Sequence, residues 1–348
     1  MAIIRKKTED IRHFILSNVQ KHPTDIVKIT AGHFQITKQS VHKHMRALIT
    51  QGDIVSEGKT LSKRYLLGKG RIAFFSLKIS EKIEEHKVWF GFIKPLLEDL
   101  PDNIKELWSY SFQEILNNAI EHSEGENIEI RAEQSDGKTS ITITDDGVGI
   151  FHKLCNVYKL DDEKHAALEL SKGKFTTDPS NHTGQGIFFS SRMVDSFLIH
   201  SGRASLIHYR DNEFDFVLEG KSDDHKGTIV EMKLENNTSR TVNKVFDMFE
   251  EPEDEDHGFV KTIIPLKLAQ FEQEMMISRS QARRVLSRLN RFKYVILDFK
   301  GIERIGQAFA DEIFRVFSSE HPEIKLYPSN TNEQIENSIK KAFTDARM

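Results

Sequence analysis

Three short segments in the middle of the chain, rich in glycine and polar residues, constrain its fold more than any other feature. They occupy residues 114–122, 145–149 and 184–186. Each segment is weak evidence when taken singly, because an ExxxNxxxH row is usually a solvated helix face, and DxGxG or GxG is usually a turn. Three such segments in this order and at this spacing predict a nucleotide-binding site.

The first segment lies in a helical pattern, because apolar residues recur around it at three- and four-residue steps. On this helix Glu114, Asn118 and His122 are successive i, i+4 positions, so they share one face. A carboxylate, an amide oxygen and an imidazole in a row suit a Mg²⁺ ion that keeps several waters. We expect Asn118 to supply one oxygen ligand and Glu114 to orient or deprotonate a water.

The second and third segments add an acceptor and a phosphate-binding backbone. An alternating apolar stretch predicts a half-buried strand that ends at Asp145, whose carboxylate suits an exocyclic amino group such as that of adenine. Gly147 and Gly149 remove side chains where the backbone turns sharply or approaches a ligand. Gly184 and Gly186 open another apolar helical run, where exposed backbone N–H groups can hold phosphate.

In this order the three segments resemble the N box and the two glycine boxes of the Bergerat or GHKL fold. DNA gyrase, heat-shock chaperones, sensor histidine kinases and the mismatch protein MutL share that ATP-binding fold. The resemblance spans roughly residues 72–236, and residues 118–123 look closest to the anti-sigma-factor serine kinases. It implies that Asn118 binds Mg²⁺, that Asp145 reads adenine, and that Glu114 is the catalytic residue that activates water or accepts a proton.

The same resemblance implies further contacts to ATP. Thr228 follows a glycine in a Gly-Thr element near the adenine. Residues 151–182 would form a lid over the phosphates, where Lys172, Gly173 and Lys174 supply charge and flexibility. The complete set of expected cofactor-binding residues is Asn118, His122, Asp145, Gly147, Gly149, Lys174, Gly184, Gly186 and Thr228.

The overall charge of −4 hides a strong asymmetry. Residues 1–71 contain 14 Lys and Arg against 5 Asp and Glu, a net charge of +9, so the remainder carries −13. A basic module on an acidic body favours a polyanionic partner for the N-terminal part.

The N-terminal module also has the pattern of a DNA-binding unit. Apolar spacing predicts three helices, with Thr24 capping the second, a turn at residues 32–36 and Thr37 capping the third. Residues 53–59 and 63–67 then predict a hairpin. The pattern resembles the winged helix-turn-helix of bacterial repressors, in which the third helix enters the major groove and the wing touches phosphate. The expected DNA-binding residues are Lys38, Gln39, Ser40, Lys43, Arg46, Lys63 and Arg64. A winged helix used only for protein contacts is the alternative.

The C-terminal part begins after an acidic run at residues 250–258, which is typical of a solvated linker. Alternating strand and helix patterns then predict a small α/β domain. Residues 297–311 resemble the strand-turn-helix of STAS domains, the fold of anti-sigma-factor antagonists, and look closer still to STAS-like domains fused behind GHKL modules. In the antagonists a serine opens this helix and accepts phosphate, whereas residues 304–307 here carry no hydroxyl. The resemblance therefore favours docking on the ATP-binding domain more than a phosphoswitch.

We therefore predict an α+β multidomain protein. Its parts are a winged helix (1–71), a Bergerat α/β sandwich with a mixed sheet and one helical layer (72–249), the acidic linker (250–258) and a STAS-like domain (259–348). Cys155 is the single cysteine, so no disulfide framework is expected. No apolar run approaches the roughly 18 residues of a membrane span and the start has no signal-length apolar core, so we expect a cytoplasmic protein with no membrane partner.

The functional prediction is an ATP- and Mg²⁺-dependent DNA-binding transcription regulator, in which the STAS-like domain docks within the chain or on a protein partner. A homodimer is compatible with this organisation. Two alternatives stay open: a serine or protein kinase of the anti-sigma-factor type, and a nucleotide-binding adaptor without turnover. A histidine kinase is not expected, because His86 lacks the acidic and proline-containing residues that follow a phosphoacceptor histidine, and Pro95 is too distant.

Overall fold

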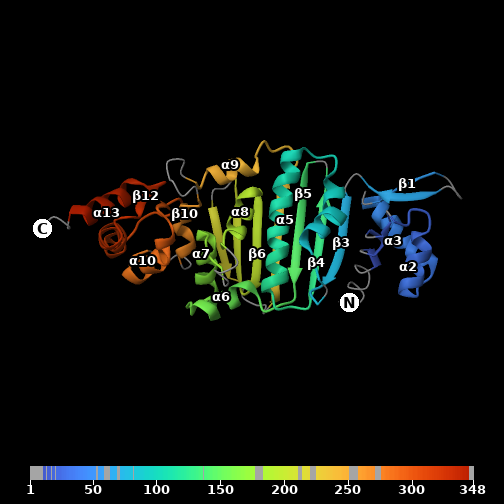
Figure 1. Ribbon diagram of the computed structural model, residues 1–348, viewed down its shortest axis with the longest axis horizontal. Helices are drawn as coiled ribbons and strands as arrows, with labels where there is room; N and C mark the ends of the chain where they lie inside the picture. The colour runs from blue at the N-terminus through green and yellow to red at the C-terminus, as the bar shows by residue number, and fades with distance from the viewer. Residues whose placement is uncertain are drawn as a thin grey trace.

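The computed structural model arranges the chain as three bodies in a row, with the N-terminal module at one end and the C-terminal α/β unit at the other (Figure 1). It describes residues 11–12, 14–16, 18–19, 21–51, 54–58, 63–68, 71–80, 82–135, 137–176, 183–210, 214–219, 225–250, 258–270 and 276–344. Three expected features therefore lie partly outside the described residues: the wing tip at 59–62, the lid at 177–182 and the acidic linker at 251–257.

The N-terminal module packs around a core of its own. Helical residues between 11 and 18 precede α2 (Ile26–Phe34), α3 (Lys38–Gln51) and an antiparallel hairpin of β1 (Ile54–Glu57) and β2 (Arg64–Leu67). This element order agrees with the sequence-based expectation. The side chains that build this core are apolar and buried: Ile11, Ile15, Leu16, Val19, Ile26, Val41, Met45, Leu48, Ile54 and Tyr65.

Two helix boundaries in this module differ from the expectation. The N-cap of α2 is Asp25 and not Thr24, and α2 continues through Phe34 until Gln35 ends it in the left-handed conformation, with φ of 52°. The predicted turn at residues 32–36 is therefore shorter than expected. The predicted cap of α3 is confirmed, because the Ser40 N–H donates to Thr37 Oγ1 over 3.2 Å.

The central body is a seven-stranded sheet with helices packed on it (Figure 1). Its strands, in spatial order, are β3 (Arg71–Lys78), β4 (Asn127–Gln134), β5 (Lys138–Asp145), β9 (His225–Glu235), β6 (Ser196–Gly202), β7 (Ala204–Tyr209) and β8 (Phe214–Glu219). The α-helices between these strands are α4 (Glu85–Val88), α5 (Asp102–His122), α6 (Ile150–Tyr158), α7 (Glu163–Lys172) and α8 (Gly186–Met193), and α9 (Val242–Asp247) follows the last strand. The expected mixed sheet needs correction, because every pairing between these described strands is antiparallel.

Helix α5 and strand β5 show how the sequence builds this domain. Alternate residues of β5 are buried, and the helix carries a stripe of buried apolar residues, so the two hydrophobic faces can pack together. Trp108 and Phe112 are fully buried on α5, and Ile141 is fully buried on β5. The polar edge of the helical stripe, which carries Glu114 and Asn118, lies at the margin of this core.

The C-terminal body is a three-stranded parallel sheet with helices, as its alternating pattern predicts. The strands are β10 (Lys261–Pro265), β11 (Tyr294–Asp298) and β12 (Lys325–Ser329). The helical segments are 3₁₀ turns at Leu266–Ala269 and Leu289–Arg291, a π-helical turn at Glu312–Phe317, and α10 (Arg279–Leu286), α11 (Gln307–Asp311), α12 (Ser318–Glu320) and α13 (Glu333–Thr344).

The central and C-terminal bodies share one hydrophobic core. Phe259, which enters the C-terminal sheet, lies 4.6 Å from Phe188 and 4.9 Å from Phe189 of α8, measured between ring centroids. Phe249 joins the same aromatic cluster. The two bodies therefore stabilise each other through buried apolar contacts.

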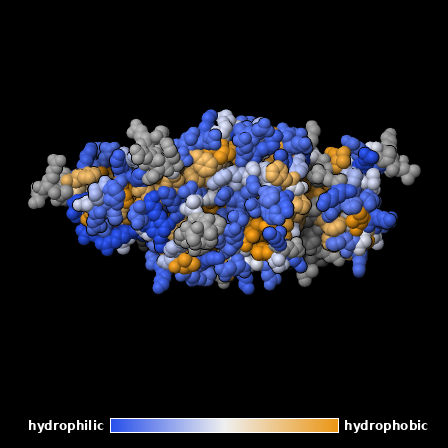
Figure 2. Space-filling model, viewed as in Figure 1, coloured by the Kyte–Doolittle hydropathy of each residue, from blue (hydrophilic) through white to orange (hydrophobic). Residues whose placement is uncertain are grey.

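The visible face of the molecule is mostly hydrophilic, with small and separate hydrophobic patches (Figure 2). Over the part of the chain that the structure describes, no helix has both the length and the apolar character that a bilayer span needs.

Candidate nucleotide-binding site

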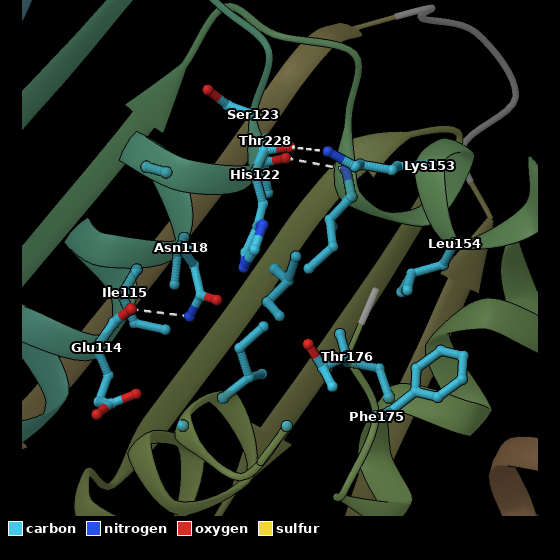
Figure 3. Close-up of a pocket in the computed structure, with 18 of the residues that line it drawn as sticks. Glu114, Ile115, Asn118, His122, Ser123, Lys153, Leu154, Phe175, Thr176 and Thr228 are labelled. Atoms are coloured by element: carbon cyan, nitrogen blue, oxygen red, sulfur yellow. Dashed lines mark hydrogen bonds between the residues drawn. The ribbon is translucent and has the colours of Figure 1, made fainter. Parts of the chain in front are cut away.

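A cavity opens between the last turns of α5, the end of β5 and the start of α8 (Figure 3). Seven of the ten residues predicted for the nucleotide site line it: Glu114, Asn118, His122, Asp145, Gly184, Gly186 and Thr228. Apolar side chains from α5, α6, α7, β5, β6, β9, the start of α8 and the segment after α7 complete the wall: Ile115, Ala119, Ile143, Ile150, Leu154, Leu170, Phe175, Ile187, Ile199 and Val230. The result is an apolar pocket with a few polar groups at defined positions, as in many ligand sites.

The polar row on α5 is held in a fixed orientation. The side-chain amide of Asn118 donates to the Glu114 carbonyl over 2.8 Å, which turns the amide oxygen of Asn118 toward the cavity (Figure 3). One turn further along, the His122 carbonyl accepts a hydrogen bond of 2.9 Å from Lys153 Nζ. The amide oxygen of Asn118 is therefore available as a ligand for a hard cation.

Asp145 is the buried acid of the cavity, with 6% of its surface exposed. Its Oδ1 accepts hydrogen bonds from the backbone N–H groups of Gly147, at 3.0 Å, and Thr228, at 3.2 Å. Burial raises the pKa of this carboxyl, and the two backbone donors oppose that rise. Thr228 is fixed in turn, because its hydroxyl accepts from the Ile150 N–H over 3.1 Å. Strands β5 and β9 thus place a buried and oriented acceptor in the cavity.

The two glycines of the first glycine segment, Gly147 and Gly149, position Asp145 and do not line the cavity. A Cβ at Gly147 would overlap the carbonyl oxygen of Ser123, so only glycine lets this turn close against the end of α5. Gly149 has φ of 84°, a backbone conformation that favours glycine, and it immediately precedes α6. Both glycines therefore act through the turn that carries Asp145.

The second glycine segment brings a helix start against a carboxylate. Gly184 and Gly186 line the cavity where α8 begins. The carboxylate of Glu114 lies directly against Gly186, where a Cβ would overlap its Oε2. Backbone N–H groups at a helix start favour phosphate, so Glu114 stands beside the position where a phosphate chain would lie.

The lysine that lines the cavity is not the one that was expected. Lys174 does not line the cavity: its Nζ donates to the Arg291 carbonyl over 2.9 Å, in the C-terminal body. Lys153 of α6 lines it instead, and its Nζ also pairs with Glu124 at 2.7 Å. The sequence carried a signal for Lys153, because Ile150, Lys153 and Leu154 fall at i, i+3 and i+4 on one helix face directly after the first glycine segment.

The donor set fits a magnesium ion carried by a nucleotide. Among the residues that the structure describes, no group of three or more His, Cys, Asp or Glu side chains could hold a metal ion. Mg²⁺ commonly keeps several waters and takes the rest of its ligands from one or two protein oxygens and substrate phosphates. Asn118 would supply the protein oxygen, and the ion would neutralise charge on the phosphates.

The predicted DNA-contacting residues form a separate group on α3 and the hairpin. Lys38, Gln39, Lys43, Arg46 and Arg64 are exposed. Ser40 and Lys63 are half-buried, and Lys63 Nζ lies 5.0 Å from the ring centroid of Tyr65.

Two family models match the chain. The histidine kinase-, DNA gyrase B- and HSP90-like ATPase model matches residues 107–238, and the STAS-like domain of unknown function (DUF4325) matches residues 281–336. No curated protein matches the chain significantly. The central domain is thus a GHKL-type ATPase domain, which implies ATP binding, usually with Mg²⁺. The protein joins this domain to a STAS-like domain, and the pair supports an ATP-binding regulatory function.

Proposed function

We propose that the protein is an ATP- and Mg²⁺-controlled regulator that binds DNA through its N-terminal module. The observation that supports ATP binding is that Asn118, Asp145 and Thr228 line the same cavity. Asp145 would accept from the adenine amino group, and Asn118 would ligate the ion. Glu114 would orient or deprotonate a water beside the phosphates, which gives slow hydrolysis.

The DNA part is supported by the charge and the shape of the N-terminal module. Residues 1–71 carry a net charge of +9, and α3 exposes Lys38, Lys43 and Arg46 while its opposite face is buried. An exposed basic helix followed by a hairpin with Arg64 exposed is the arrangement of a winged helix that inserts one helix into the major groove. A homodimer of this module would need two half-sites about 10 base pairs apart, or a multiple of that spacing.

A protein kinase is the second candidate, and the position of Glu114 against the start of α8 favours it. A carboxylate there can accept the proton of an attacking hydroxyl as well as that of a water. The acceptor would be a serine on another protein or the exposed Ser280 of this chain, because Ser278 is engaged as the N-cap of α10 in a capping box with Gln281. Transfer of a radiolabelled γ-phosphate from ATP to a co-purified protein, and its loss in Glu114→Ala, tests this candidate.

The experiment for the main proposal is fluorescence anisotropy of DNA from the region upstream of the gene, titrated with the full chain. We expect saturable binding that weakens as salt rises and that changes by about 5- to 150-fold when Mg²⁺ and ATP are added. A nucleotide that binds without any effect on DNA affinity would favour the adaptor, and the absence of DNA binding would leave the N-terminal module with protein contacts only.

A further inference from the structure

Helix α7 of the lid is packed between the cavity and the C-terminal domain. Its Leu170 lines the cavity, while the side chain of Lys172 is fully buried in the opposite direction. Lys172 Nζ lies 2.6 Å from Glu169 Oε1 and donates to the Ser287 carbonyl over 3.0 Å. The Lys172 carbonyl accepts from Thr262 Oγ1 of β10 over 2.7 Å. The side-chain ammonium and the backbone carbonyl of Lys172 are therefore both hydrogen-bonded to the C-terminal domain.

Because the Lys172 ammonium is buried, losing one of its hydrogen-bond partners is energetically costly. Burial lowers the pKa of the Lys172 ammonium, and the Glu169 carboxylate opposes that change. A buried ammonium needs a paired carboxylate and hydrogen-bond acceptors, because an unpaired buried charge is costly. The Ser287 carbonyl is one of these acceptors, so withdrawing the C-terminal domain removes a partner that Lys172 uses.

Two arginines of the C-terminal domain extend the contact along the lid. Arg284 of α10 pairs with Asp161 at 3.0 Å and Asp162 at 3.4 Å, just before α7. The guanidinium of Arg288 lies 3.4 Å from Glu169 and 5.1 Å from the ring centroid of Phe175. Phe175 lines the cavity, so these contacts reach from the C-terminal domain to the cavity wall.

The chain after α7 is held in an uncommon backbone conformation. Gly173 and Lys174 have φ of 84° and 53°, both in the left-handed region, which is unfavourable for lysine. Lys174 Nζ donates to the Arg291 carbonyl over 2.9 Å, and the Arg291 guanidinium donates to the Lys174 carbonyl. This reciprocal pair with the C-terminal domain helps to stabilise the unfavourable backbone conformation of Lys174.

The cavity is small in this arrangement. Its volume is about 130 Å³, below the roughly 300–1,000 Å³ of most ligand sites. Phe175 and Thr176, which follow the reciprocal pair directly, line the cavity. A nucleotide therefore gains room when this part of the lid moves.

We propose that the STAS-like domain is a clamp on the lid that restrains nucleotide binding, and that Lys174 exchanges its partner when the clamp opens. In the clamped state Lys174 Nζ bonds to the Arg291 carbonyl, and in the open state it turns to the phosphate chain. One ammonium cannot occupy both positions, so the clamp and the nucleotide oppose each other, and each weakens the other by the same factor. This inference rests on the proposed ATP site and adds the regulation of that site.

The test uses the full-length chain with the double substitution Arg284→Ala/Arg291→Ala. These side chains contact the lid but not the cavity wall. The matched control is Arg279→Ala/Arg304→Ala, in which Arg279 pairs with Asp311 inside the C-terminal domain and Arg304 is exposed. Calorimetric titration with ATP and Mg²⁺ should show at least about fivefold tighter binding for the clamp variant than for the wild type and the control.

Adenosine, which lacks phosphates, tests the exchange of Lys174. Lys174→Met in the clamp variant should reverse most of the gain for ATP and leave adenosine affinity unchanged. Hydrogen exchange without nucleotide should be faster at residues 163–176 in the clamp variant only. If the double variant does not fold, Arg284→Ala alone removes the contacts to Asp161, which is exposed, and Asp162, which is half-buried, and makes the same comparison.

The outcomes distinguish failure of the clamp from failure of the proposed ATP site. Equal or weaker ATP binding by the clamp variant overturns the restraint. Unchanged ATP binding in Lys174→Met within the clamp variant overturns the exchange. Absence of ATP binding in every protein overturns the ATP site itself, and faster lid exchange in the clamp variant would still show that the C-terminal domain holds the lid.

Discussion

Asp145→Asn is the most specific test of adenine recognition, because asparagine is nearly isosteric with aspartate and changes only the charge and the hydrogen-bonding pattern. In the protein, Oδ1 accepts from the backbone N–H groups of Gly147 and Thr228. An asparagine at this position can keep its oxygen on those two donors, and its NH₂ group then occupies the place of the second carboxylate oxygen. A donor would then face the amino group of adenine, which is also a donor.

The magnitude follows from the loss of a hydrogen bond to a charged acceptor. Such a bond contributes about 1.5–3 kcal/mol, and about 1.4 kcal/mol corresponds to a factor of ten in affinity. We therefore expect Asp145→Asn to weaken ATP binding by about 10- to 150-fold. Guanine places a carbonyl where adenine has its amino group, so the same substitution should also reduce the preference for ATP over GTP.

Isothermal titration calorimetry with ATP and GTP measures both effects. The control is Asp146→Asn, because Asp146 is the neighbouring carboxylate and its hydrogen bonds go to the backbone of Glu126 and to Asn127, away from the cavity. The reasoning is refuted if Asp145→Asn binds ATP as tightly as the wild type, or if both substitutions weaken ATP equally.

Two further predictions concern turnover and DNA. Glu114→Ala should lower ATP turnover by about 10²–10⁴-fold while ATP still binds, because a base at this position acts in the chemical step; full turnover in a coupled phosphate-release assay would remove that role. Lys63→Ala/Arg64→Ala should weaken binding to all DNA sequences, and the slope of log binding constant against log salt concentration should fall in magnitude by about one per charge removed. Lys43→Ala/Arg46→Ala should instead relax sequence specificity, at a cost of about 1–3 kcal/mol of binding free energy for each base that α3 no longer contacts. Unchanged affinity and slope in both pairs, measured by anisotropy across a salt series, would contradict the DNA prediction.

The elements that carry the site were predictable from the sequence because their signals are local. The row on α5 follows from helical periodicity, and the position of Asp145 at the end of β5 follows from strand alternation. The cap at Thr37 follows from its place before an apolar periodic run. The family models confirm two of the predicted domain types, the GHKL-type ATPase domain and the STAS-like domain.

The features that the sequence did not reveal depend on contacts between distant parts of the chain. The orientation of Lys174 is determined by Arg291, which lies far along the chain and belongs to another domain. The shared core of the two domains depends on Phe259, although the acidic run before it suggested separate units. The antiparallel order also escaped prediction, because alternation shows that a strand exists and not which neighbour it pairs with.

Calorimetric titration of ATP into the full chain, with Mg²⁺ and again with a chelator, is the direct test of magnesium-dependent ATP binding in this cavity. We expect saturable binding that weakens when Mg²⁺ is removed, because the ion would link the phosphates to Asn118. Asn118→Ala should bind ATP with Mg²⁺ about as weakly as the wild type does without it. Absence of ATP binding, or binding that neither Mg²⁺ removal nor Asn118→Ala changes, would contradict the assignment of this cavity as a magnesium-dependent ATP site.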